Sequence, residues 1–110
     1  MKRTPITLRF FGGRTATVVG EIAPVAPHLP QTFVIHRNHH LERGGESVVS
    51  EQSTGCRVVR GDFDDTKAVV LEAARQKLAR VTPERMQQAM DRTRRQLADE
   101  GHGLSSAEGA

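Results

Sequence analysis

Tryptophan and tyrosine are absent from this sequence of 110 residues, and phenylalanine occurs only four times. The core must therefore be built mainly from aliphatic residues, which predicts a thin core of marginal stability. The single cysteine, Cys56, excludes an intramolecular disulfide and fits a reducing compartment. No apolar run approaches the roughly 18 residues of a membrane span, and residues 1–20 lack the apolar region of a signal peptide. We therefore expect a cytoplasmic protein that has no membrane contact.

The sequence motifs of common catalytic sites are also missing. We find no G-x-S-x-G, no P-loop and no G-x-G-x-x-G. The glycines of FGGR (residues 11–14) are not followed by a helix, so they do not form a phosphate cradle. The acids of GDFDD (residues 61–65) could hold a cation, but helix capping explains them better. We expect no enzyme, no catalytic residue and no cofactor.

Positive charge is present and unevenly distributed. The formal net charge is +3, yet residues 66–98 carry eight Lys and Arg against three acids. Residues 1–60 carry eight Lys and Arg against four acids, whereas residues 61–65 and 99–110 are acidic. This distribution predicts attraction to a polyanion, which is either nucleic acid or an acidic protein surface. Solubility alone is the alternative explanation.

The first half of the chain has the two-residue period of β-strands. The segments ITLRFF and RTATVVGEI alternate on either side of Gly12-Gly13, which predicts a hairpin over residues 5–22 with a two-residue turn. Prolines recur every third residue in 23–31, which we interpret as a stiff spacer; the alternative is a docking motif for an aromatic-lined groove. Residues 32–60 predict a strand and a second hairpin, whose turn Ser53-Thr54-Gly55 places Gly55 in the left-handed region.

The second half changes to a helical period. Asp64 or Asp65 is expected to cap the first helix, and Thr82-Pro83 ends it and starts a second helix that runs to about residue 99. The expected apolar face of the first helix consists of Val70, Leu71, Ala74, Leu78 and Val81. That of the second helix consists of Met86, Ala89, Met90, Thr93 and Leu97.

These elements predict an α+β fold. We expect one domain over residues 1–100, in which a small, mostly antiparallel β-sheet (two hairpins plus one strand) is followed by two C-terminal helices over 64–99 that pack on one face. Residues 101–110 are expected to form a flexible tail.

Basic side chains on the second helix are the best candidates for a binding surface. One stripe, opposite the apolar face, contains Arg85, Gln88, Arg92 and Arg95, and Arg94 flanks it. Arginine binds phosphate bidentately, so such a helix can lie along a nucleic-acid backbone; a solvated helix face is the alternative. Arg37 and Arg43 would form a second basic patch.

A cluster of histidines raises a different hypothesis. The stretch HRNHH contains His36, His39 and His40, and Cys56 follows at a distance along the chain. Imidazole nitrogen and thiolate sulfur are ligands that zinc prefers. The spacing of these residues matches no zinc signature, however, and neither CxxC nor HExxH is present. We favour a basic loop over a metal site and keep a His/Cys zinc protein as an alternative.

A partner protein is the remaining alternative. Met86, Met90 and Leu97 form a narrow apolar seam that could support a homodimer or receive a partner helix. The segment CRVVRGDFDDTKAVVLEAARQKL resembles the strand, turn and helix of HicB-type antitoxins through Gly61-Asp62, Ala68, Ala73-Ala74 and Leu78, over about a fifth of the chain. We expect none of these 110 residues to form the separate DNA-binding domain often seen in that family, and the resemblance assigns no family. It fits an inhibitor or regulator of the antitoxin or phage and plasmid accessory (anti-defence) type.

Overall fold

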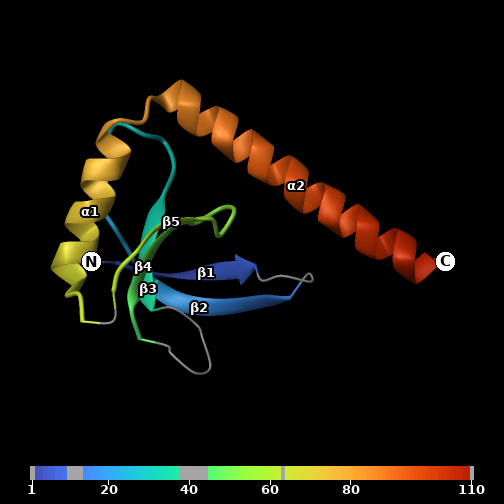
Figure 1. Ribbon diagram of the computed structural model, residues 1–110, viewed down its shortest axis with the longest axis horizontal. Helices are drawn as coiled ribbons and strands as arrows, with labels where there is room; N and C mark the ends of the chain where they lie inside the picture. Colours follow the sequence, from blue (N-terminus) through green and yellow to red (C-terminus); the bar gives the residue numbers. More distant parts are fainter. Residues whose placement is uncertain (1, 10–13, 38–44, 63, 110) are drawn as a thin grey trace.

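Five strands form one antiparallel sheet in chain order, and two helices follow (Figure 1). The computed structural model describes residues 2–9, 14–37, 45–62 and 64–109. The strands are β1 (Arg3–Arg9), β2 (Thr15–Ile22), β3 (Phe33–Arg37), β4 (Ser47–Glu51) and β5 (Arg57–Arg60). The helices are α1 (Lys67–Ala79) and α2 (Pro83–Gly109). The predicted α+β fold class is confirmed.

The register of the first hairpin decides which face of each strand is buried. Arg9 pairs with Thr15 and Ile6 pairs with Val18, so five residues, 10–14, separate the last paired positions. The predicted two-residue turn at Gly12-Gly13 lies outside the described residues. A shift by one residue would turn every side chain to the other face of the strand. The observed register instead places Val18 on the same face as Ile6 and Leu8, and the three pack with Val34 in a small apolar cluster.

The first hairpin lies across the rest of the sheet rather than continuing it side by side. Only Glu21 and Ile22 of β2 pair with β3, and in Figure 1 the β1–β2 ribbon runs across β3. The two strands approach closely at Gly20, where an added Cβ would lie 2.5 Å from Val34 Cγ1. The hairpin therefore covers the sheet face that is opposite to α1.

Helix α1 covers the other face and forms the main core. Val70, Leu71, Ala74 and Leu78 are buried, as predicted, in the same cluster as Phe33, Ile35 and Val49 of the sheet. The predicted cap was wrong, however. Thr66 is the N-cap, and its hydroxyl accepts from the Val69 N–H at 3.3 Å. The carboxylate of Asp65 instead accepts from the Asp62 N–H at 2.7 Å and closes the turn before the helix.

The proline-containing segment between β2 and β3 is part of the core. Its apolar residues are buried, and these are Ala23, Val25, Ala26 and Leu29. A turn at residues 27–28, closed by Leu29 N–H donating to the Ala26 carbonyl at 3.1 Å, interrupts any extended proline helix. Nε2 of His28 hydrogen-bonds the carbonyls of Leu78 and Val81, at 3.1 and 3.0 Å, so this segment also holds the end of α1. The structure thus supports neither a simple spacer nor a free docking motif.

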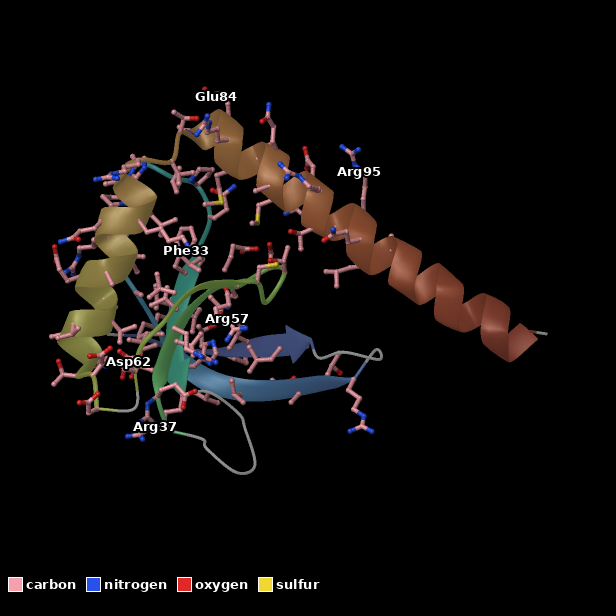
Figure 2. All side chains as sticks on the ribbon, in the orientation of Figure 1. Phe33, Arg37, Arg57, Asp62, Glu84 and Arg95 are labelled. Atoms are coloured by element: carbon pink, nitrogen blue, oxygen red, sulfur yellow. The ribbon has the colours of Figure 1, made fainter. Side chains whose placement is uncertain are left out.

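Helix α2 starts on the core and then leaves it. Met86 and Met90 are buried with Phe33, which lies between α1 and the first turns of α2 (Figure 2). The helix continues to Gly109 and extends away from the sheet (Figure 1), whereas the sequence predicted its end near residue 99 and a flexible tail beyond. No proline follows Pro83, so every later residue retains the N–H that a helix uses. Among the described residues, neither helix is long and apolar enough to span a membrane.

Candidate functional site

The exposed face of α2 carries the predicted arginine stripe. Thr82 starts the helix, because its hydroxyl accepts from the Arg85 N–H at 3.2 Å and its carbonyl accepts from the Met86 N–H at 3.0 Å. Since Met86 and Met90 point into the core, helical geometry turns the stripe to solvent, and all its members are exposed: Arg85, Gln88, Arg92 and Arg95. Figure 2 shows Arg95 pointing away from the sheet.

These arginines are not neutralised by nearby described acids. Within the described side chains, Arg94 pairs with Asp91 at 3.6 Å, while Arg85, Arg92 and Arg95 have no carboxylate within ion-pair distance. From Arg85 to Arg95 the stripe extends about 15 Å along the helix, given the rise of about 1.5 Å per residue. A row of exposed guanidinium groups of this length can contact successive phosphates along one nucleic-acid strand.

The predicted second basic patch does not join this stripe. Arg37 ends β3, is exposed, and donates to the Gly45 carbonyl at 3.5 Å. In Figure 2 it lies at the end of the sheet opposite to α2. Arg43 lies outside the described residues. The structure therefore separates Arg37 from the α2 arginines, so both cannot contact one short stretch of ligand.

Of the four candidate zinc ligands, the structure describes only His36 and Cys56. His36 is buried, its Nδ1 donates to the Arg37 carbonyl at 3.0 Å, and its Nε2 is 2.8 Å from the Ser50 hydroxyl. Burial lowers the pKa of His36 below its ordinary value of 6.5, against a smaller opposite effect of the hydrogen bond to Arg37. Cys56 is half-buried and lies 3.7 Å from Thr93 Oγ1. His39 and His40 lie outside the described residues. In the described part of the chain, no three His, Cys, Asp or Glu side chains are grouped for a metal ion.

The predicted dimer seam is largely occupied within the chain. Met86 and Met90 are 6% and 5% exposed because they pack on the core. Leu97, further along α2, is only half-buried. A homodimer through all three residues would require α2 to leave the sheet.

A polar pocket that the sequence did not predict lies between α2 and the sheet. Its volume is about 460 Å³. It is lined by three segments: the end of the proline-containing segment, the β4–β5 turn and one side of α2. The lining residues are Pro30, Gln31, Thr32, Glu51, Gln52, Ser53, Gln87 and Arg94.

Glu51 shapes the pocket wall and is almost completely buried. Its Oε2 accepts from the Ser53 N–H at 2.6 Å. Its Oε1 accepts from the Ser53 hydroxyl, the Thr54 N–H and the Thr54 hydroxyl, at 2.5, 3.0 and 2.9 Å. These four bonds fold the turn, and Gly55, at φ 71°, completes it as predicted. An acid two residues before Ser-Thr-Gly at a strand end is the local signal for this turn, but nothing in the sequence announces the pocket.

Comparison with known proteins finds no matching family model, no matching curated protein and no matching solved structure.

Proposed function

We propose that this protein is a small, basic, non-enzymatic binding protein that contacts the phosphate backbone of nucleic acid through the exposed stripe of α2. The observation that carries the proposal is the row of solvent-exposed arginines, Arg85, Arg92 and Arg95, without a described carboxylate partner. An arginine whose only role is solubility can also stabilise its helix by pairing with a nearby acid, as Arg75 does with Glu72 at 3.4 Å. A row that has no such partner among the described side chains keeps its positive charge available for a polyanion.

The burial of Ser50 and His36, the two side chains that could act as a nucleophile and its base, also favours a binding role over catalysis. The Ser50 hydroxyl and His36 Nε2 are 2.8 Å apart, which is the separation of a nucleophile and its base. However, Ser50 is 1% exposed and His36 is 6% exposed, so a substrate cannot reach them. The pair joins β3 to β4 and serves the fold.

The alternative of a partner protein added to the sheet edge has less support. On β1, Pro5 lacks an N–H, and its carbonyl accepts from Gln52 Nε2 at 3.2 Å. On β5, the Val58 carbonyl accepts from Lys77 Nζ at 2.7 Å. Both described sheet edges are thus partly occupied by the protein's own side chains. The regulator hypothesis therefore depends on a surface other than these edges or the buried methionines.

The test is fluorescence anisotropy of labelled duplex and single-stranded oligonucleotides over a range of salt concentrations. We expect binding that weakens as salt rises, because each neutralised phosphate releases counterions. In the variant Arg92→Gln/Arg95→Gln, the slope of the logarithm of the binding constant against the logarithm of the salt concentration should become less steep by about two. This is roughly one for each lost phosphate contact. The matched control is Arg75→Gln/Arg80→Gln, which removes the same charge from exposed positions near α1. Equal loss in both variants would show that only net charge matters and would overturn the proposed interface.

A further inference from the structure

The β1–β2 hairpin turns one of its two faces to solvent. This outer face contains Pro5 and Thr7 of β1, which lie opposite Val19 and Thr17 of β2. Three of these side chains are exposed and that of Thr7 is half-buried, whereas the inner face carries the small apolar cluster that contains Val34. The hairpin projects away from α1 (Figure 1), and the exposure of its outer side chains shows that no described element covers them. A ligand can therefore reach this face.

The size of this two-stranded ribbon matches the major groove of B-form DNA. Seven residue pairs, from Arg3 opposite Glu21 to Arg9 opposite Thr15, give a length of about 20 Å at roughly 3.4 Å per residue. The two strands lie about 4.8 Å apart. The B-form major groove is about 12 Å wide and admits a two-stranded β-ribbon, whereas the major groove of duplex RNA is deep and too narrow for protein side chains to read. The shape of the ribbon therefore favours duplex DNA over duplex RNA.

Positive charge lies at the two ends of the ribbon, and its middle is uncharged. Arg3 is exposed at one end, and Arg14, which directly precedes β2, is exposed at the other. Residues 2–22 contain one acid, Glu21, and Lys67 of α1 compensates its charge through an ion pair of 2.5 Å. In the DNA groove, phosphates line both edges and uncharged base edges form the floor. The charge pattern of the ribbon is complementary to this arrangement.

The middle of the outer face offers hydroxyl and methyl groups to the base edges. Oγ1 of Thr7 and Oγ1 of Thr17 are 3.3 Å apart, so one hydroxyl donates to the other and the second keeps its own proton for a ligand. Val19 is 65% exposed, more than any other large apolar side chain that the structure describes. Threonine hydroxyls can hydrogen-bond several bases, and apolar groups contact the C5 methyl group of thymine. The face therefore suits base pairs that contain thymine.

We propose that the outer face of the β1–β2 ribbon enters the major groove of duplex DNA. The arginines at its ends contact the flanking phosphates, and the two threonines and Val19 lie against base edges. This inference rests on the proposed nucleic-acid binding and specifies its ligand as B-form DNA. The ribbon is a different surface from the α2 stripe, whose Arg95 points away from the sheet (Figure 2). Each surface can therefore be tested with its own variants.

The experiment compares the affinity of the full chain for a DNA duplex and an RNA duplex of the same sequence, measured by fluorescence anisotropy. We expect the DNA duplex to bind about tenfold more tightly, because only its major groove admits the ribbon. Val19→Glu should remove this preference, since the new carboxylate would face the negative potential of the groove. The matched control is Val69→Glu, which makes the same change at the other exposed valine, on α1, and should keep the preference. Circular dichroism shows whether both variants remain folded.

Two further measurements test the base and phosphate contacts separately. Replacing thymine by uracil in the DNA duplex removes only the C5 methyl groups, and it should weaken binding about fourfold, the usual effect of one buried methyl group. Val19→Ala should reduce this discrimination. Arg3→Gln/Arg14→Gln should make the salt dependence of DNA binding less steep by about two. Its control is again Arg75→Gln/Arg80→Gln.

The outcomes separate the ribbon from the α2 stripe. Equal affinity of the wild type for the DNA and RNA duplexes would refute the ribbon interface, as would a Val19→Glu protein that binds DNA as tightly as Val69→Glu does. Arg92→Gln/Arg95→Gln should weaken DNA and RNA alike and keep the preference for DNA, because its contacts are to phosphates alone. If this stripe variant binds as the wild type does while Val19→Glu loses the preference, the α2 interface fails and the ribbon stands.

Discussion

Gly20 of β2 crosses Val34 of β3 so closely that a Cβ on Gly20 would lie 2.5 Å from Val34 Cγ1 and 2.6 Å from the Ile35 carbonyl oxygen. This contact lets the first hairpin lie against the second face of the sheet. Because one of the two obstacles is backbone, a rotamer change cannot relieve the clash. The orientation of the β1–β2 hairpin therefore depends on a missing side chain.

We expect Gly20→Ala to destabilise the protein by about 1–3 kcal/mol, which is the usual cost of overpacking a core. Urea unfolding followed by circular dichroism measures this, since the chain has no tryptophan for fluorescence. The control is Val19→Ala, at a neighbouring position that is 65% exposed, and it should change the free energy of unfolding only slightly. Equal stability of Gly20→Ala and wild type would contradict the close crossing.

Glu51 provides a second prediction. Replacing it with Gln leaves one acceptor oxygen for four donors, and the new NH₂ group faces N–H and O–H groups. Buried donors without acceptors cost about 1–3 kcal/mol, so we expect Glu51→Gln to lower the free energy of unfolding by at least that amount. Glu72→Gln on the exposed face of α1 is the control for the change of charge. A Glu51→Gln protein as stable as this control would show that the turn does not need the carboxylate.

The sequence predicted elements well where one local pattern decides the structure. Alternation located the strands, and the 3.6-residue period located the buried face of α1, including Val70 and Leu78. Competing local patterns were harder to resolve. The acids before α1 suggested Asp64 or Asp65 as its N-cap, but the hydroxyl of Thr66 accepts from the Val69 N–H. The carboxylate of Asp65 closes the preceding turn instead, and the sequence alone does not decide between these two roles.

The pocket was beyond sequence analysis for a physical reason. Gln31, Glu51, Gln87 and Arg94 come from three segments that are far apart in the chain, and they share no periodicity. They meet only because Met86 and Met90 seat α2 on the core. By contrast, the exposed arginines of α2 follow directly from helical spacing once the buried methionines are known, so that part of the candidate site was predictable.

His36 predicts a dependence of stability on pH. Its pKa is lowered in the folded protein, so the unfolded chain takes up the proton first as the pH falls below about 6.5. The free energy of unfolding should therefore decrease as the pH falls from 6.5 towards the lowered pKa of the folded state, and this contribution should then level off. Urea unfolding at a series of pH values, compared between wild type and His36→Gln, isolates the effect from that of the carboxylates. Identical pH profiles would contradict the burial of a neutral imidazole.

Substitution of a methionine on α2 can show whether these side chains belong to the core of one chain or to an interface between two chains. Met90 is 5% exposed within a single chain, so Met90→Ala should cost about 2–5 kcal/mol by leaving a cavity. The cost should be the same at every protein concentration, since no partner is required to bury the side chain. Leu97→Ala is the companion variant. Because Leu97 is only half-buried, this substitution should lower the free energy of unfolding by less than Met90→Ala does. Thermal unfolding over a wide concentration range, together with sedimentation, tests this. If the midpoint of the wild type rises with concentration and Met90→Ala removes that rise, the methionine seam joins two chains and α2 does not rest on its own sheet.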